Sequence, residues 1–383
     1  MHQRLQFIAA IDESDESFSE ICRRFGISRK TGYKWLSRYE QLGPRGLEEQ
    51  APIARSFPHR VLEPIEDLVV ALRKEQPTWG PKKLRAALLA RGMAAMPAVS
   101  TLGEVLKRNG LIRPRRRRVR TPPSVVPLTV GQQANDVWCV DFKGDFALGD
   151  KTRCYPLTIS DHATRYLLKC EGLTSTQHEP VRVHFERVFR EFGMPTHIRS
   201  DNGVPFASTA IGGLSPLSVW WMKLGITPER IEPGQPQQNG RHERMHKTLK
   251  QETATPPCAD MASQQRLFDR FRHHYNDVRP HEALGQKTPS SRYSSSPRAL
   301  PAMLSSPSYP DTMKVRKLDE GGKFRPAGAD NKIVLGALLS NEPIGLEPID
   351  DDRWEIFYGS ILLGELRIRH REARLQRAGA IGR

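Results

Sequence analysis

Three short stretches decide how this sequence is interpreted: Trp138-Cys139-Val140-Asp141-Phe142, Ser200-Asp201-Asn202-Gly203 and Asn239-Gly240-Arg241-His242-Glu243-Arg244. Their acidic residues occupy three predicted elements, with Asp141 in a strand, Asp201 at a strand end and Glu243 in the first turns of a helix. Converging carboxylates supply the oxygen ligands that hard divalent cations prefer. Two cations in one site stabilise the attacking and leaving oxygens of a phosphoryl displacement. The sequence therefore predicts a metal-dependent phosphoryl-transfer site.

The composition favours a nucleic-acid partner. The 383 residues include 59 Lys and Arg against 43 Asp and Glu, which gives a formal net charge of +16. Such an excess attracts double-stranded DNA, although a soluble protein that is merely basic is the alternative. The five cysteines form no CxxC pair, so neither a zinc finger nor a disulfide framework is expected. No membrane partner is expected either, because no apolar run approaches the length of a membrane span, and the first residues lack a signal-peptide core.

Residues 1–50 have the pattern of a helix-turn-helix DNA-binding domain. Ser17 and Glu20 form a capping-box pair at the start of one predicted helix, Gly26 ends that helix, and Ser28 caps the next. The second helix opens with basic and hydroxyl side chains, as a recognition helix does. An ordinary helical hairpin whose charges face water is the alternative. The predicted DNA contacts are Arg29, Lys30, Thr31 and Lys34.

Residues 58–112 predict a second helical domain. Pro81 suits the first turn of a helix that follows the break at Trp79-Gly80, and Ser100 or Thr101 is expected to start another helix. The candidate recognition segment, residues 97–101, lacks basic side chains. A helix-turn-helix-like domain that reads DNA and a helical spacer therefore both remain open.

A basic linker is expected at residues 113–130. Its central arginines repel one another, and the Pro-rich residues 121–127 favour an extended chain. We expect this segment to lie along DNA phosphates, and a solvated linker without a function is the alternative. The four arginines assigned to phosphate contact are Arg115, Arg116, Arg117 and Arg118.

Residues 131–295 alternate strand and helix signals, which predicts an α/β layer architecture with a mixed sheet. A loose Ser- and Pro-rich connector is expected at 285–310, and a small barrel at 311–372. The expected strands of the α/β region are 137–146, 154–159, 165–170, 196–199 and 226–231, and its expected helices are 179–192, 220–224, 237–253 and 264–277. The strands expected for the barrel are 313–318, 332–335, 345–349, 354–358 and 361–368.

The order of these motifs resembles that of the DDE transposases of bacterial insertion sequences, whose catalytic core is similar to that of retroviral integrases. The resemblance covers roughly residues 1–295, and residues 239–250 are its most specific segment. The interval between Asp201 and Glu243 is longer than is common in this family. Its excess falls in the Gly- and Ser-rich loop 211–217, so the triad is expected to remain intact. Residues 279–284 resemble the usual close of the core, and the C-terminal strands resemble small SH3-like modules.

The resemblance implies an RNase H-like α/β catalytic core with N-terminal helix-turn-helix domains and a small C-terminal β-barrel. It implies that Asp141, Asp201 and Glu243 hold two Mg²⁺ ions, with Mn²⁺ as a possible substitute. The implied activity is DNA cleavage at the inverted-repeat ends of an element, followed by strand transfer of the 3′-OH into target DNA. A dimer or higher multimer on paired ends would perform it, in the bacterial cytoplasm with the nucleoid. A nuclease that does not join ends and a repressor with a non-catalytic core are the alternatives, and the intact triad argues against the repressor.

Two lysines and two asparagines near the triad have expected supporting roles. Lys247 and Lys250 share a helix face with Glu243, so we expect them to contact phosphate; a surface ion pair between Glu243 and Lys247 is the alternative. Asn202 and Asn239 are expected to hold the carboxylates or the helix start, and a simple Asn-Gly turn is the alternative for both.

Two histidines also lie near Glu243. His242 and His246 are four residues apart on the same predicted helix, which resembles the spacing of a metal-binding pair. Because Mg²⁺ prefers oxygen ligands, we expect these side chains to contact DNA or solvent instead.

Overall fold

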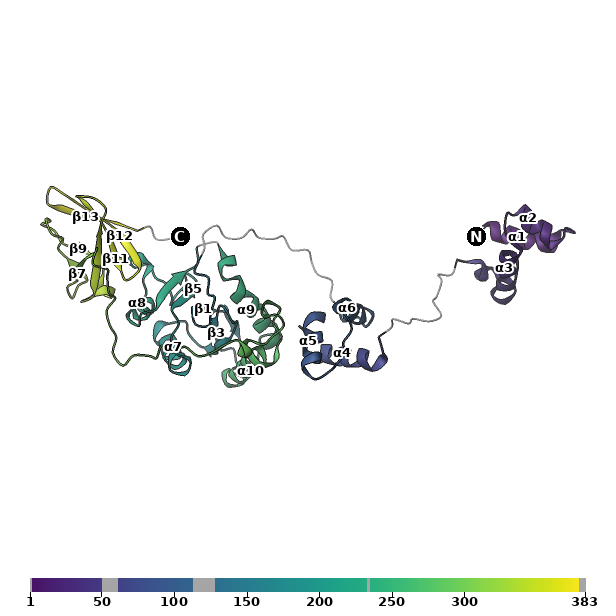
Figure 1. Ribbon diagram of the computed structural model, residues 1–383, viewed down its shortest axis with the longest axis horizontal. Helices are drawn as coiled ribbons and strands as arrows, with labels where there is room; N and C mark the ends of the chain where they lie inside the picture. Colours follow the sequence, from purple (N-terminus) through teal and green to yellow (C-terminus); the bar gives the residue numbers. More distant parts are fainter. Residues whose placement is uncertain (1, 50–60, 113–127, 233–234, 379–383) are drawn as a thin grey trace. The chain divides into compact units, whose positions relative to one another are not determined.

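The computed structural model describes residues 2–49, 61–112, 128–232 and 235–378 (Figure 1). The chain divides into two compact units, Met1–Leu62 and Glu63–Arg383. All five cysteines are free thiols. Among the described residues, none of the helices has the length and apolar character needed to cross a lipid bilayer.

The first unit has an aromatic core beneath three helices, α1 (His2–Glu13), α2 (Phe18–Arg24) and α3 (Arg29–Leu42). Phe7 is fully buried, and the rings of Phe18, Phe25 and Trp35 meet it edge-on at centroid distances of 6.0, 5.5 and 5.6 Å. Gly32 lets α3 approach this core closely, because a Cβ at that position would lie 2.7 Å from the Cys22 sulfur.

The predicted helix signals of the first unit are confirmed. The Ser17 hydroxyl accepts a hydrogen bond from the Glu20 amide, and the Glu20 carboxylate accepts one from the Ser17 amide, which completes the capping box. Ser28 caps α3 by accepting from the Thr31 amide. Gly26 adopts a φ of +66° in the turn between α2 and α3, where side chains other than glycine are strained.

Three further helices open the second unit: α4 (Glu63–Glu75), α5 (Pro81–Ala90) and α6 (Val99–Arg108). Pro81 is in the first turn of α5, as predicted, whereas α6 begins at Val99 and not at Ser100 or Thr101. These helices pack on the α/β region that follows. Trp79 is fully buried and stacks on His274 at 5.6 Å, and the Thr78 hydroxyl donates to Glu252.

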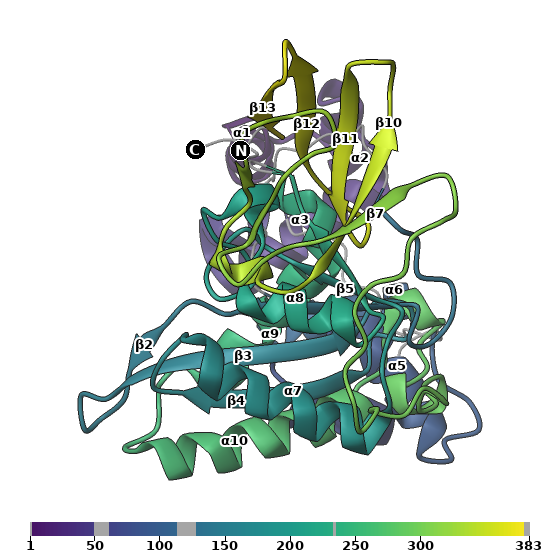
Figure 2. The same cartoon turned by 90° about the vertical axis from the view of Figure 1, so that its left-hand side faces the viewer.

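A mixed sheet forms the centre of the second unit. Strand β1 (Val137–Phe142) pairs antiparallel with β3 (Arg153–Asp161), which pairs antiparallel with β4 (Leu167–Leu173). On its other side β1 pairs parallel with β5 (His197–Ser200), and β5 with β6 (Thr227–Arg230). Figure 2 shows β3 as the long strand of this sheet, with the short β2 (Phe146–Ala147) beside one end of it. This strand order confirms the predicted RNase H-like α/β core; the strand expected at 137–146 is divided into β1 and β2.

Helices cover both faces of the sheet. On one face α7 (His178–Phe192) and α8 (Pro216–Lys223) enclose a core with Trp138, Val140 and Ile159 of the strands. On the opposite face α9 (Gly240–Thr253) and α10 (Met261–His273) pack on Cys154, Leu167 and Cys170. Because side chains alternate along a strand, Asp141 points to the face opposite that of Val140, where α9 lies.

The prediction of a loose connector at 285–310 is wrong. Tyr293 stacks on Tyr166 with a centroid distance of 4.3 Å and an interplanar angle of 9°. The Ser296 amide donates to the Phe192 carbonyl at 2.8 Å, and Arg298 donates to carbonyl groups at Pro195 and Gly225. Ser and Pro composition predicted flexibility, but a Ser- and Pro-rich chain without regular structure is ordered where its backbone finds partners on a neighbouring surface.

The C-terminal strands form open sheets, so closure into a barrel is not confirmed. The larger sheet has the order β13-β12-β11-β10-β7, and a separate hairpin pairs β8 with β9. Strands β8 and β13 lie outside the five strands predicted for this region. The strands are β7 (Lys314–Lys317), β8 (Lys323–Phe324), β9 (Ile333–Val334), β10 (Pro343–Pro348), β11 (Arg353–Tyr358), β12 (Ile361–Arg369) and β13 (Glu372–Arg377).

The loop 211–217 has a structural role that the sequence did not predict. Ile211 and Leu214 of this loop share one apolar cluster with Val219 and Met222 of α8 and with buried side chains of the C-terminal sheet, among them Leu363. Lys223 forms an ion pair with Glu342 at 2.6 Å beside this cluster. The additional residues between Asp201 and Glu243 thus help to seat the C-terminal sheet on the core.

Candidate active site

Asp141 and Asp201 lie at the same edge of the central sheet. Asp141 is the penultimate residue of β1, and Asp201 directly follows β5. Because β1 and β5 are parallel neighbours, their carboxyl ends meet at one edge. The Gly203 amide donates to Oδ1 of Asp201 at 3.1 Å and orients that carboxylate.

Glu243 approaches this edge from α9, which packs over β1. Its side chain is exposed in the first turn of the helix. Burial raises the pKa of Asp141 to about 7, and the negative charges of Asp201 and Glu243 add to this effect while Lys143 opposes it. Burial also raises the pKa of Asp201. Asp201 and Glu243 therefore both lie within electrostatic reach of Asp141.

The donor set fits a hard divalent cation in its chemistry. All three side chains offer carboxylate oxygens, which Mg²⁺ and Mn²⁺ prefer. Within the described ranges, no group of three or more His, Cys, Asp or Glu side chains is close enough to hold a metal ion as it stands. Since like charges repel, the carboxylates would have to move closer to one another when a cation neutralises them.

The prediction that His242 and His246 contact DNA or solvent is wrong. Both imidazoles are buried, 1% and 4% exposed, and face the sheet. The Thr158 hydroxyl of β3 lies 2.7 Å from Nε2 of His242 and 2.6 Å from Nε2 of His246, and the Ser160 hydroxyl lies 2.7 Å from Nδ1 of His242. The physical reason is helical periodicity, because these histidines share their face with the apolar residues of α9 that pack on the sheet.

This buried network reaches the candidate catalytic carboxylate. Nδ1 of His246 lies 3.5 Å from Oδ2 of Asp141, and the Thr158 hydroxyl donates to the Asp141 carbonyl at 3.1 Å. Burial lowers the pKa of His242 to about 3 and also lowers that of His246, so both rings are neutral. Sequence reasoning missed Thr158 and Ser160. Their spacing of two residues in a predicted strand was the signal that both point toward the same helix.

Neither asparagine near the triad has the role first expected of it. Asn202 donates to the Ile231 carbonyl at 2.7 Å, which ties the end of β5 to the end of β6 and not to a carboxylate. Asn239 precedes α9 but its side chain does not cap the helix. Its buried Oδ1 has no hydrogen-bond partner among the described residues.

The predicted DNA-contacting side chains are accessible where the structure describes them. Lys247 and Lys250 are exposed on α9, and these described residues show no ion pair between Lys247 and Glu243. On α3, Arg29, Lys30 and Lys34 are exposed, whereas Thr31 is half-buried with its hydroxyl 2.9 Å from that of Ser28. The linker arginines Arg115, Arg116, Arg117 and Arg118 lie outside the described residues.

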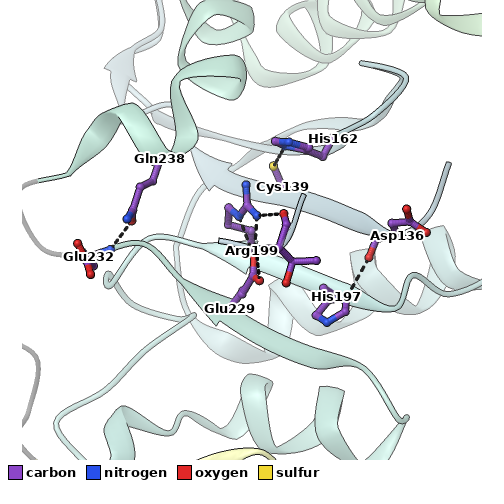
Figure 3. Close-up of polar contacts among 9 residues, drawn as sticks. Asp136, Cys139, His162, His197, Arg199, Glu229, Glu232 and Gln238 are labelled. Atoms are coloured by element: carbon purple, nitrogen blue, oxygen red, sulfur yellow. Dashed lines mark hydrogen bonds and ion pairs between the residues drawn. The ribbon is translucent and has the colours of Figure 1, made fainter. Parts of the chain in front are cut away.

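Polar contacts brace the strands that carry the aspartates (Figure 3). Arg199 of β5 is 3% exposed and donates to Glu229 of β6 at 2.8 and 2.9 Å. On β1, the Cys139 thiol lies 3.6 Å from Nδ1 of His162. Burial raises the pKa of Cys139 to about 12, so this sulfur is a protonated thiol and not a nucleophile. Of Cys139 and the carboxylates at this sheet edge, only the carboxylates are therefore candidates for a catalytic role.

Family models match both the core and the N-terminal region. A model described as Integrase core domain matches residues 131–236, and a second model of the same description matches 224–289. A Helix-turn-helix domain model matches residues 3–53, and a Homeodomain-like domain model matches residues 31–106.

Relatives with similar sequences come from bacterial insertion elements. The chain is 29% identical over 184 residues to an uncharacterized 39.2 kDa protein of element IS476 from Xanthomonas euvesicatoria, a match that covers 47% of this chain and 50% of that protein. A 31.7 kDa protein of element IS407 from Burkholderia multivorans is 27% identical, with 58% of this chain and 78% of that protein covered. The transposase InsD of element IS2 from Escherichia coli is 26% identical, with 56% and 73% covered. The chain thus spans about half of the first relative and about three quarters of the other two.

Solved structures with a similar arrangement include retroviral integrases. The catalytic core domain of HTLV-2 integrase in complex with magnesium has a TM-score of 0.33 and 14% identity, and covers 43% of this chain and 99% of that chain. A simian T-cell lymphotropic virus intasome chain has a TM-score of 0.38 and 16% identity, with 77% and 97% covered. Because these TM-scores are low, the fold assignment rests on the strand order and on the family models.

The strand order and the integrase-core matches define an enzyme of the polynucleotidyl transferase class with an integrase-like catalytic core. Its sequence similarity to the insertion-element proteins identifies the chain more narrowly. The chain is similar to proteins of bacterial insertion elements, among them a transposase.

Proposed function

We propose that Asp141, Asp201 and Glu243 form the metal-binding catalytic triad of an active DNA transposase. The observation that carries this proposal is the convergence of two parallel strands and one helix on a single sheet edge, where burial and the charges of the other two carboxylates raise the pKa of Asp141. Mutual repulsion among carboxylates is the property expected of a site that works with bound cations.

In the proposed reaction, the protein cleaves a phosphodiester bond at an element end and joins the freed 3′-OH to target DNA. Two Mg²⁺ ions bound by the triad would stabilise the attacking and leaving oxygens of each displacement. Asp141 and Asp201 would supply ligands from paired strands, and Glu243 would supply a ligand from the helix start. The attacking group is water in cleavage and the DNA 3′-OH in joining, so no side chain has to act as a covalent nucleophile.

In this proposal each domain has a separate role in DNA binding, catalysis or assembly. Residues 1–50 would read the element ends through α3, and residues 58–112 and 113–130 would add further contacts. The core at 131–295 would carry the chemistry, with Lys247 and Lys250 on phosphates beside the triad. Residues 311–372, which the resemblance compares with an SH3-like barrel, would bind DNA or a second protomer. A dimer or higher multimer would pair two ends in the bacterial cytoplasm, because one triad acts on one strand end at a time.

Isosteric variants of the triad test the proposal. Asp141→Asn, Asp201→Asn and Glu243→Gln should each reduce Mg²⁺-dependent cleavage and joining to background, while binding to end DNA remains, because the proposed DNA-reading helix α3 lies elsewhere in the chain. Glu179→Gln is the matched control, since Glu179 is exposed at the start of α7 on the other face of the sheet. Normal joining by any triad variant would remove that residue from the site.

The same assays decide between the proposal and its two alternatives. A nuclease would cleave end DNA but would not join a pre-cleaved 3′-OH to target DNA. A repressor with a non-catalytic core would bind the ends without metal-dependent cleavage, and the triad variants would behave like the unmodified protein.

A further inference from the structure

A cavity of about 570 Å³ lies beside the first turn of α9, next to Glu243. Its walls come from separate parts of the second unit: the turn between β3 and β4, the start of α9, the segment after α10, and α5 of the preceding helical domain. The volume falls within the range of about 300–1,000 Å³ that is usual for ligand sites. Because the cavity borders a triad residue, its chemistry bears on what the active site binds.

Positive charge dominates the walls of this cavity. Two acidic groups, Glu243 and Glu282, face five basic ones, and Glu282 is already paired with Lys82 outside the walls. Of the basic groups, Arg279 is paired with Glu252 at 2.9 Å. The remaining four have no carboxylate within salt-bridge distance among the described residues: Lys83, Arg165, Arg241 and Arg244.

Arg165 is the most informative of these side chains. Its Nε atom is buried and has no hydrogen-bond partner among the described residues. The residue also has a φ of +66° in the turn between β3 and β4, a conformation that costs free energy for residues other than glycine. Burial and the neighbouring Arg241 lower the pKa of Arg165 to about 10. A guanidinium that is desolvated among like charges does not stabilise the fold, so its position points to a role in binding.

Lys83 connects this cavity to the helical domain. It lies on α5, two residues after Pro81, and burial together with Arg279 and Arg244 lowers its pKa to about 8. The contacts of Thr78 and Trp79 with the core hold α5 in this place. The cavity therefore has its full set of cationic groups only when the helices of residues 63–108 are packed on the catalytic core.

We propose that this cavity binds a backbone phosphate of the DNA substrate next to the phosphodiester that reacts, with Arg165 and Lys83 as its principal contacts. The proposal rests on the proposed function, since it concerns the DNA held at the triad. Guanidinium groups bind phosphate oxygens through paired N–H donors, and an ammonium group adds a point charge. A phosphate at this place fixes the distance between the substrate backbone and Glu243. It also gives the second helical domain a role at the active site, whether or not that domain reads bases.

Charge-neutral variants of the full chain test the site. Arg165→Gln and Lys83→Gln should each lower the slope of log affinity against log salt concentration by about 0.9, the value for one phosphate contact with duplex DNA. Lys107→Gln is the matched control, because Lys107 is exposed on α6 of the same helical domain and is not part of the cavity wall. It should leave the slope unchanged. Binding is measured on uncleaved end DNA in EDTA, so an inactive triad does not affect this result.

Single neutral linkages identify the phosphate. Methylphosphonate substituted at one position at a time in the end DNA should reveal a linkage near the cleavage site whose neutralisation weakens binding of the unmodified protein. The same substitution should have no further effect on Arg165→Gln. Additive losses at every linkage would overturn the proposal.

Thermal unfolding separates binding from a structural role. Arg165→Gln should keep or raise the melting temperature, because it removes an unpaired and partly buried charge. A lower melting temperature without a change in salt slope would give Arg165 a structural role and overturn the proposal.

Inorganic phosphate is a second probe. If phosphate raises the melting temperature of the unmodified protein but not that of Arg165→Gln, while the salt slope of DNA binding is the same for both, the cavity is a site for a free anion only. If Arg165→Gln and Lys83→Gln leave the salt slope unchanged while the triad variants still abolish cleavage and joining, this site is rejected and the proposed function stands.

Discussion

The imidazole of His246 bridges the sheet and the proposed triad: its Nδ1 lies 3.5 Å from Oδ2 of Asp141, and its Nε2 lies 2.6 Å from the Thr158 hydroxyl. A neutral imidazole has one donor and one acceptor nitrogen, and the Thr158 hydroxyl has a single proton. When Nδ1 donates to Asp141, Nε2 is an acceptor and competes with the Asp141 carbonyl for that proton. His242 and Ser160 extend this chain of polar groups away from the carboxylate. The arrangement resembles the outer-shell hydrogen bonds that orient metal ligands.

Replacement of His246 by two different amides should separate the functions of its two nitrogens. His246→Asn retains a donor near the position of Nδ1, whereas His246→Gln retains one near Nε2. We expect His246→Gln to weaken Mn²⁺ binding by about 10–100-fold, as losses of outer-shell partners do, and His246→Asn to weaken it by much less. Electron paramagnetic resonance of free Mn²⁺ gives the affinity without any catalytic assay. Equal affinities for both variants and the unmodified protein would show that His246 only fills space.

The pKa of Asp141 predicts how stability depends on pH in the absence of metal. Its value in the fold is about 7, against 3.8 for an ordinary aspartate. Folding therefore favours the protonated form, and this contribution is fully present below about 3.8 and is lost as the pH rises through about 7. Asp141→Asn should remove this pH dependence and raise the free energy of unfolding at pH 8 by up to about 4 kcal/mol.

Thermal unfolding in EDTA at pH 5 and pH 8 measures this effect. Asp150→Asn is a suitable control, because Asp150 is exposed in the loop between β2 and β3. A lower melting temperature of Asp141→Asn than of the unmodified protein at pH 8 contradicts the prediction.

Recognition by the first unit should depend on the exposed start of α3. Replacement of Arg29 or Lys34 by Ala should cost about 1–3 kcal/mol of binding to end DNA if the side chain reads a base, with little effect on unfolding. Gly32→Ala should instead destabilise the unit, because the added Cβ would lie 2.7 Å from the Cys22 sulfur. Binding to end DNA and to unrelated DNA, measured with unfolding curves, distinguishes the two effects. Equal losses on both DNAs would mean that Arg29 and Lys34 contact phosphates only.

The arginine run should contribute to affinity but not to specificity. Replacement of Arg115, Arg116, Arg117 and Arg118 by Gln should lower the salt slope by up to about four units, since each phosphate contact contributes about 0.9. The ratio of end to unrelated DNA affinity should remain the same. An unchanged salt slope would show that these residues do not touch phosphate.

Contact between the C-terminal sheet and the core should contribute more to the joining of paired DNA ends than to the cleavage of a single end. Gly212 has a φ of +61°, and a Cβ there would lie 2.9 Å from Leu363. Gly212→Val should therefore loosen the sheet, increase its proteolysis and reduce joining of paired ends more than cleavage of one end. Gly285→Val is the control, because its φ is +65° but nothing lies within 4 Å of its Cβ position. Equal defects in both assays would restrict the sheet to a general stabilising role.

Local signals in the sequence were enough to predict much of this protein. The caps at Ser17 and Ser28 and the position of Pro81 depend on nearest neighbours along the chain, and the structure confirms all three. Alternation and turn signals predicted the succession of strands and helices along the chain and a mixed sheet. The resemblance to DDE transposases implied that Asp141 and Asp201 share one site. The structure brings them to one sheet edge because β1 and β5 are parallel neighbours.

Tertiary structure decided which groups surround those carboxylates. The composition of 285–310 predicted a loose connector, but the ring of Tyr293 stacks on that of Tyr166 and holds this segment on the core. His242 and His246 were predicted to be accessible, but the face of α9 that carries them packs on the sheet, where both imidazoles contact the Thr158 hydroxyl. The four cavity cations that have no carboxylate partner among the described residues come from α5, α9 and the turn after β3, and no local pattern relates these segments. Spacing along the chain determines which residues share one face of a helix or strand. Which part of the protein that face contacts depends on residues far apart in sequence, because those contacts form only when the whole domain packs.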